Sequence, residues 1–192
     1  MIEKITRLKN HNDPYVKEKC FALTAETLVD RAIELKYIGG CYGGTRRPSK
    51  FLCLIMKMLM IQPEDEIVLE FIKNKDYKYI RALGAFYWRL IGHAKDIYKV
   101  LEPLYSDYRR LVIRKDSGLF EELHMDEFID NLLRDELFCD VTLPRISKRH
   151  VLEEEGVLEP YQSALNIQDE EIVEQDEQLQ EQIEEVKMQR KD

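Results

Sequence analysis

The chain has 192 residues, of which 44% are hydrophobic, and its formal net charge is −8. This length accommodates one domain of ordinary size and an extension. Residues 169–192 hold ten acids against three bases, so residues 1–168 carry a charge of only −1, which excludes a domain-wide basic surface for nucleic acid. No apolar run reaches the roughly 20 residues of a membrane span, and the N-terminus lacks a signal core, so we expect neither a membrane segment nor secretion.

The N-terminal segments show a helical period. A short first helix is expected to end at the polar turn 10–14. Thr24 is placed to cap a second helix, whose apolar side is Leu28, Ala32 and Leu35. That helix is expected to stop where the glycines begin.

Residues 39–44 contain four of the eight glycines in the chain, a density that marks an irregular loop. Pro48 and Ser49 then start a helix that is apolar almost all round from residue 51 to 61. Such a helix is typically buried, so we expect it at the centre of the fold. Exposure of any of its three methionines would instead favour a partner-binding groove there; these are Met56, Met58 and Met60.

Three further helices are expected. Pro63 is interpreted as the first residue of one of them. The next covers residues 77–91, where Gly84 allows a neighbouring helix to approach closely. The third covers 94–108 and bends at Pro103.

One segment departs from the helical period. Residues 111–113 and 119–121 flank a polar turn and predict a small β-hairpin, after which helical period resumes at 128–133. The predicted fold class is therefore all-α: a compact multi-helix domain with one small β-hairpin over residues 1–155. A charged, helical C-terminal extension is expected over residues 156–192.

The C-terminal part has an apolar residue at every seventh position. Only Ile183 supplies the second apolar position that a coiled-coil seam needs in each heptad. We expect residues 170–190 to form a solvated helix that docks one thin edge onto a partner; a charged tail with accidental spacing is the equally weighted alternative. The repeating residues are Val151, Leu158, Leu165, Ile172, Leu179 and Val186.

Two basic clusters are the candidate binding sites. The glycine loop matches neither GxGxxG nor GxxxxGK[ST], so a structural loop is favoured over a nucleotide cradle. Cations follow it directly, however, and others lie in the hairpin; such clusters can bind an RNA backbone or an acidic peptide, with a solvated surface as the default alternative. The candidate partner- or RNA-binding residues are Tyr42, Arg46, Arg47, Lys50, Arg114 and Lys115.

No pattern in the sequence indicates catalysis. The four histidines lie in separate segments without metal-ligand spacing, and no nucleophile elbow occurs. We therefore expect no catalytic residue, no metal and no cofactor. The four cysteines lie far apart without a CxxC pair, which favours reduced thiols in a cytosolic or nuclear protein.

Over residues 1–155 the sequence resembles the pre-mRNA-splicing factor 38 family. Many ungapped strings appear in the order that the family has. They are IGG at 38–40, YGG at 42–44, FLCL at 51–54, IQPE at 61–64, FIKN at 71–74, KYIRALGA at 78–85, LEPLY at 101–105, DYR at 107–109, DEFID at 126–130, LPR at 143–145 and VLEE at 151–154.

This resemblance implies a nuclear, non-enzymatic protein of the precatalytic spliceosome, which acts with the tri-snRNP when the complex is activated. It implies partners among other splicing proteins: a helical protein related to microfibrillar-associated protein 1 and a zinc-finger protein. Many relatives extend into an arginine/serine-rich tail, whereas this chain ends in an acidic segment, so functions tied to such a tail do not carry over.

Three hypotheses follow. The first is a scaffold whose grooves take partner helices. The second is direct contact with small nuclear RNA within the assembly, which should weaken steeply with salt. The third, an enzyme, has no motif with a mechanism behind it. The cations that would serve RNA contact are Arg46, Arg47, Lys50, Arg109, Arg110, Arg114 and Lys115.

Overall fold

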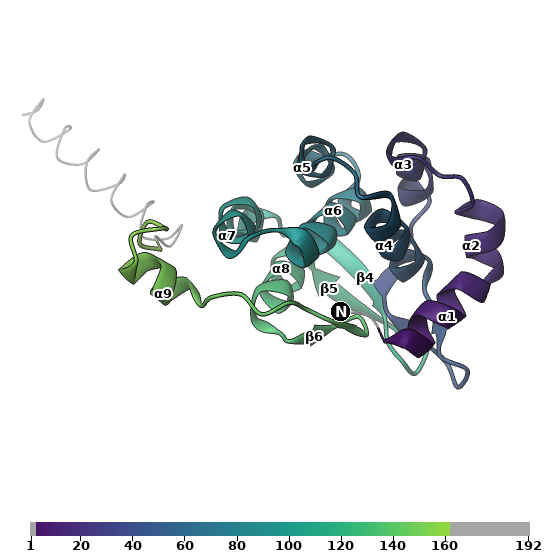
Figure 1. Ribbon diagram of the computed structural model, residues 1–192. Helices are drawn as coiled ribbons and strands as arrows, with labels where there is room; N and C mark the ends of the chain where they lie inside the picture. Colours follow the sequence, from purple (N-terminus) through teal and green to yellow (C-terminus); the bar gives the residue numbers. More distant parts are fainter. Residues whose placement is uncertain (1–2, 162–192) are drawn as a thin grey trace, which may run out of the picture. The chain divides into compact units, whose positions relative to one another are not determined.

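A computed structural model describes residues 3–161 of the chain (Figure 1). The chain divides into two compact units, Met1–Lys148 and Arg149–Asp192. The first unit contains most of the described structure and is predominantly helical. Its α-helices are α1 (Lys4–Asn12), α2 (Pro14–Lys19), α3 (Ala25–Ile33), α4 (Lys50–Ile61), α5 (Asp65–Lys73), α6 (Lys78–Ile91), α7 (Ala94–Leu101) and α8 (Met125–Arg134).

The most buried helix is α6, not α4 as the sequence suggested. Every residue of α6 from Ile80 to Leu90 is buried, including Arg89, whose Nε donates to the carbonyl oxygen of Leu132 in α8 at 2.7 Å. A Cβ added at Gly84 would lie 2.9 Å from the Cβ of Phe71 in α5. The predicted close approach at this glycine is therefore confirmed, and α5 is the helix that approaches.

Helix α4 is buried only along part of its length. Ser49 caps its first turn, and the five residues 51–55 are all buried. Towards its end the helix reaches the surface, because α1 and α2 lie on its outer side without covering it fully (Figure 1). Met58 is buried, whereas Met60 is 74% exposed. The expectation of a helix buried all round was wrong.

Small sheets accompany the helices, so the all-α prediction was incomplete. The predicted hairpin is confirmed as β4 (Arg110–Arg114) and β5 (Phe120–His124), and β1 (Ile38–Gly39) pairs with β4 in parallel. Two further antiparallel pairs occur within residues 3–161. They are β2 (Cys41–Tyr42) with β3 (Arg47–Pro48), and β6 (Leu137–Phe138) with β7 (Val141–Thr142).

Close approach of backbone explains the first two glycines of the loop. A Cβ at Gly39, whose φ is +150°, would lie 2.6 Å from the carbonyl oxygen of Arg114 in β4. A Cβ at Gly40 would lie 2.6 Å from the carbonyl oxygen of Cys139. Real Cβ atoms cannot come so near to backbone, so both positions need glycine. We expected a structural loop that crosses close to a neighbouring helix, and this was wrong: the close neighbours are a strand and a turn.

Several helix boundaries differ from the prediction. Thr24 forms the expected cap, in a capping box with Thr27. Pro63, in contrast, precedes α5, whose N-cap is Glu64. The single helix expected over 94–108 ends at Leu101 and continues as a 3-10 helix, Glu102–Ser106. Pro103 has no backbone N–H to donate, and the chain changes helix type in its turn.

The second unit begins with α9 (Arg149–Glu154). Gly156 adopts a left-handed φ of +70° just after this helix, and its N–H donates to the carbonyl oxygen of Glu153. A left-handed glycine commonly terminates a helix, and it does so here between Val151 and Leu158. The repeating positions from Leu165 onward lie outside the described residues, and the domain boundary at residue 155 stays a prediction. Within residues 3–161 no helix has the length and apolar character to cross a bilayer.

Candidate functional site

The structure brings the aromatic and cationic members of the predicted cluster together. The guanidinium carbon of Arg114 lies 3.5 Å from the ring centroid of Tyr42, 5.1 Å from that of Phe120 and 5.6 Å from that of Tyr37. This is a cage of three aromatic rings around a cation, an arrangement that proteins use to bind cationic ligands. Here the cation belongs to the chain itself, so the cage joins β2 to the hairpin.

The other predicted cations also have partners within the chain. Arg46 pairs with Asp140 at 2.6 Å, and Arg47 pairs with Asp13 at 2.9 Å. In each case the carboxylate raises the pKa of the arginine further above its ordinary value, through charge and a hydrogen bond.

The last two candidate cations, Lys115 and Lys50, also have partners within the chain. Lys115 pairs with Glu121 at 3.3 Å, and the Lys50 ammonium lies 5.3 Å from the ring centroid of Tyr15. Tyr42, Arg47 and Lys50 line a small hollow of about 200 Å³. The cluster therefore ties the glycine loop to α2, the hairpin and the β6–β7 turn, and its role in partner or RNA binding stays a prediction.

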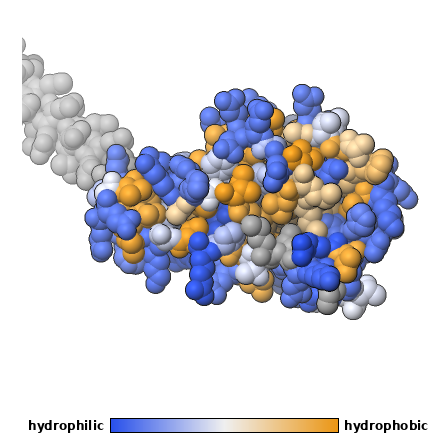
Figure 2. All heavy atoms as spheres, viewed as in Figure 1, coloured by the Kyte–Doolittle hydropathy of each residue, from blue (hydrophilic) through white to orange (hydrophobic). Residues whose placement is uncertain are grey.

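A larger surface feature, missed by the sequence interpretation, lies between α1, α2 and α4. We call it the methionine groove; its volume is about 850 Å³. Two of its apolar side chains are strongly exposed: Phe21 is 81% exposed and Met60 is 74% exposed. Figure 2 shows hydrophobic side chains gathered over α4 on this face. The groove is lined by Arg7, Asn10, His11, Val16, Lys17, Cys20, Phe21, Ala22, Cys53, Met56, Lys57, Leu59 and Met60.

A strained turn holds Phe21 in solvent. Helix α2 ends at Lys19, and Ala22 then adopts a left-handed φ of 55°. A non-glycine residue in this region costs on the order of 1 kcal/mol or more, and such strain is concentrated at functional sites. The turn places Phe21 on one side of the groove and leads the chain into the Thr24 cap of α3.

The groove also contains an unpaired buried polar atom. Asn10 is only 3% exposed; its Nδ2 donates to the Sδ of Met56, while its Oδ1 has no hydrogen-bond partner among residues 3–161. Leaving a buried acceptor unpaired costs about 1–3 kcal/mol. The atom is enclosed by the protein, so what the groove offers a partner is apolar contact area.

The charges on the groove lining are of one sign. Arg7, Lys17 and Lys57 contribute cations and His11 a titratable ring, whereas no carboxylate is among the lining residues. This arrangement suits a partner with an apolar face and acidic edges. Among residues 3–161 no three His, Cys, Asp or Glu side chains are arranged to hold a metal ion.

Sequence reasoning could have found only part of this groove. The exposure of a methionine was the criterion set for a partner groove, and Met60 meets it. Which side of α4 faces solvent depends on where α1 and α2 lie, and no local period reports that. Phe21 lies between helices, where no pattern distinguishes a core aromatic from an exposed one.

Comparison with known proteins agrees with the fold and the motifs. The model of the PRP38 family matches residues 1–156. Pre-mRNA-splicing factor 38A of Xenopus tropicalis is 58% identical over 165 residues, and that of Homo sapiens is 56% identical over 165 residues. Each alignment covers 86% of this chain and 53% of the relative. Pre-mRNA-splicing factor 38 of Drosophila melanogaster is 57% identical over 166 residues, which are 86% of this chain and 50% of the relative.

The chain therefore spans about half the length of the curated relatives it matches. Its fold matches a chain in the crystal structure of the Snu23–Prp38–MFAP1(217–258) complex of Chaetomium thermophilum, with a TM-score of 0.83 and 38% identity. That match covers 93% of this chain and 92% of the other. On the family model and on these relatives together, the chain belongs to the PRP38 family, whose members listed above are pre-mRNA-splicing factors.

Proposed function

We propose that the chain is a non-catalytic adaptor of the nuclear spliceosome, which binds other splicing proteins in the precatalytic complex and is needed for its activation. The observation that carries this proposal is the match, over 93% of the chain, to a protein crystallised with two splicing proteins. We infer that the corresponding partners here are a helical protein related to microfibrillar-associated protein 1 and a zinc-finger splicing protein.

The methionine groove is the surface that we assign to a helical partner. A helix laid along α4 would bury Met60 and Phe21, each worth about 1.5–3 kcal/mol when fully removed from water. The basic rim would favour acidic residues at the edges of the helix.

Direct contact with small nuclear RNA is the less supported alternative. The cations that sequence reasoning assigned to RNA are engaged by aromatic rings or by carboxylates of the chain; these carboxylates are Asp13, Asp107, Glu121, Glu122 and Asp140. Binding a phosphate through Arg46 or Arg47 would mean giving up an existing ion pair, which reduces the gain. An RNA mobility shift by the isolated chain that weakens steeply with salt would favour the alternative.

The proposal is tested by calorimetry with both purified partners from the same organism. We expect complexes of micromolar affinity or tighter, burying roughly 1,000 Å² or more. Met60→Glu should weaken the helical partner at least about tenfold, because it places a charge in an apolar contact. Leu119→Glu is the matched control, since Leu119 is 68% exposed and outside the groove. If neither partner binds at 50 µM, which corresponds to a binding free energy of roughly −6 kcal/mol, the adaptor proposal is wrong.

The cellular part of the proposal needs a separate test. Depletion of the protein should arrest splicing at the precatalytic complex, and the wild-type chain should restore activation. Normal activation in depleted extract would show that the chain is dispensable for this step, whatever it binds.

A further inference from the structure

A second groove lies on a different set of elements and shares no lining residue with the methionine groove. We call it the lysine groove; its volume is about 960 Å³, and it is bordered by α5, the first turn of α6, α7 and the 3-10 helix. Its apolar lining residues are Leu69, Ile72, Val100, Pro103 and Leu104.

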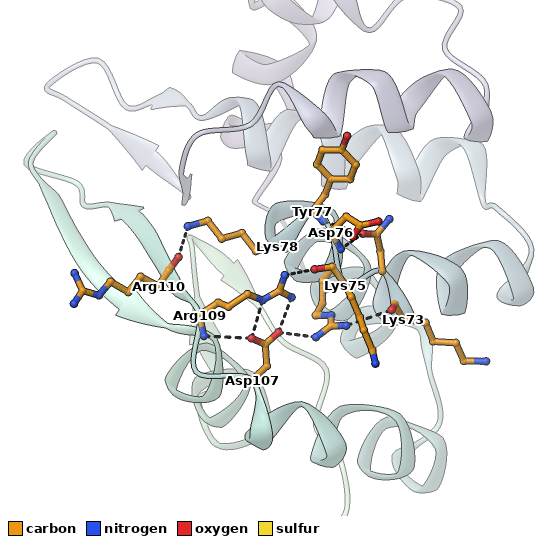
Figure 3. A network of polar contacts seen from close by, with 10 residues as sticks. Lys73, Lys75, Asp76, Tyr77, Lys78, Asp107, Arg109 and Arg110 are labelled. Atoms are coloured by element: carbon orange, nitrogen blue, oxygen red, sulfur yellow. Dashed lines mark hydrogen bonds and ion pairs between the residues drawn. The ribbon is translucent and has the colours of Figure 1, made fainter.

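A buried carboxylate organises one side of the lysine groove. Asp107 accepts from Arg81 Nη1 at 2.6 Å and from Arg109 Nη2 at 2.7 Å. The same guanidinium groups donate onward to the carbonyl oxygens of Lys73 at 3.2 Å and Lys75 at 2.5 Å (Figure 3). This network fixes the backbone at the end of α5, so it sets the positions from which the two lysine side chains start.

The positive charge of the groove exceeds what Asp107 can neutralise. Five cationic side chains and one carboxylate line it. Lys73, Lys75 and Lys99 are exposed, and none of the three has an ion-pair partner among residues 3–161. In Figure 3 the side chains of Lys73 and Lys75 extend away from the Asp107 network, and no contact is drawn to their ammonium groups.

A second feature of the site is an unpaired donor inside it. Arg81 is 92% buried, since only 8% of its surface is exposed, and its Nε has no hydrogen-bond partner within the described part of the chain. Buried guanidinium donors are normally all engaged, because an unpaired charged donor is costly. Arg81 Nε is itself enclosed, so the surplus that the groove presents to a partner is the charge of its exposed lysines.

We propose that the lysine groove binds an acidic amphipathic helix of a protein partner. Its aliphatic residues would lie on the floor formed by Ile72 and Leu104, and its carboxylates would pair with Lys73, Lys75 and Lys99. This goes beyond the adaptor proposal, because it adds a second site, selected by charge, which can be filled while the methionine groove is occupied.

The lining chemistry favours a protein over a nucleic acid. Single-stranded RNA is held by stacking of its bases on aromatic side chains, in addition to charge. None of the residues lining the lysine groove is aromatic, and the floor is built from branched aliphatic side chains and proline. Such a floor suits leucine or isoleucine anchors, and the lysine rim suits glutamate or aspartate beside them.

The test uses the full chain and a designed probe. The probe is a fluorescein-labelled 18-residue peptide with leucines at helical spacing on one face and glutamates elsewhere. A peptide of the same composition with the leucines dispersed, and an 18-residue uridine oligonucleotide, serve as comparisons. All binding is measured in the Met60→Glu background, which closes the methionine groove to the probe.

We expect the amphipathic peptide to bind with a micromolar Kd that rises with salt, and the other two probes to bind at least tenfold more weakly. The triple variant Lys73→Glu, Lys75→Glu, Lys99→Glu should weaken peptide binding at least about tenfold. In the protein that keeps these three lysines, a carbodiimide should couple them to glutamates of the peptide. The matched control reverses the charge of three exposed lysines outside the groove and leaves binding within twofold; these are Lys19, Lys36 and Lys148.

Three results would overturn the proposal. One is no peptide binding at 100 µM, and another is equal loss in the control triple variant, which would mean that only net charge matters. The third is oligonucleotide binding as tight as that of the peptide, with competition between the two, which would make the groove an RNA surface. The triple change Lys73→Gln, Lys75→Gln, Lys99→Gln replaces the reversal if far-UV circular dichroism shows misfolding.

Discussion

The predicted basic cluster and the lysine groove look alike in composition, since each gathers cations beside aliphatic or aromatic residues. In the structure they differ. Arg46, Arg47 and Lys115 are paired with carboxylates of the chain, whereas Lys73 and Lys75 have no such partner among residues 3–161. The number of cations in a segment therefore does not tell how much charge is free for a partner, because distant carboxylates decide it.

Removal of the largely buried Asp107 carboxylate at the lysine groove should have the greatest effect on stability. Asp107→Ala should lower the free energy of unfolding by about 3 kcal/mol, because Arg81 would be left buried without its counter-charge. Urea denaturation measures this change. The double variant Arg81→Met, Asp107→Ala should recover part of the loss, and no recovery would mean that the two residues act separately.

Acid should reveal the same carboxylate in the unsubstituted chain. Burial opposes ionisation of Asp107, but hydrogen bonds from Arg109 and Arg81 outweigh it and lower its pKa to about 2, from an ordinary value of 3.8. A lowered pKa gives stability that is present above pH 4 and is lost as the pH falls towards 2. We expect this contribution to reach about 2 kcal/mol.

Denaturation at several pH values measures it, with Asp107→Asn as the comparison. The Asn variant should be less stable at neutral pH and should lose less stability than the unsubstituted chain between pH 4 and pH 2. Parallel curves for the two proteins would assign the acid sensitivity to other carboxylates.

A smaller effect is expected at the aromatic cage of the predicted cluster. Arg114→Leu should cost about 1 kcal/mol of stability, because it removes a cation from the face of Tyr42 and from two further rings. Arg110→Leu is the matched control in the same strand. The Arg110 side chain is 71% exposed, and its only ion pair within residues 3–161 is a long one of 3.9 Å to Glu122. Equal costs at the two positions would show that the cage adds nothing.

One ion pair of the predicted cluster tests whether pairing within the chain limits RNA binding. Glu121→Gln frees Lys115, and this exposed pair at 3.3 Å should contribute no more than about 0.5 kcal/mol. The change should nevertheless raise the affinity of the chain for a uridine oligonucleotide at low salt, because a cation becomes available. If the affinity does not change, pairing within the chain is not what limits RNA binding here.

Sequence reasoning recovered the elements that have local signals. The Thr24 cap, the helix with Gly84 at its contact and the hairpin after residue 110 were all predicted, because capping residues, helical period and turn residues act over a few positions. The strand Ile38–Gly39 was not predicted. Two residues are too few to show alternation, and the strand exists because β4 lies beside it.

The candidate site was recovered less well. Tyr42 and Arg114 were both named, but the contact between them joins residues 72 positions apart, and no spacing rule reports it. Two of the carboxylates that neutralise the cluster are also far away in sequence, as the pairing of Arg46 with Asp140 illustrates. Both grooves depend on which helix surfaces stay uncovered after packing, so they could not be derived from periods within single helices.

The strained turn at Ala22 has a consequence for how the protein is handled in the cell. It keeps Phe21 in water beside Met60, and an open apolar surface of this kind promotes self-association when nothing fills it. An unaccompanied copy is thus exposed to aggregation and to quality control. The abundance of the chain should then follow the abundance of the partner that fills the methionine groove. Copies made in excess of that partner should be degraded.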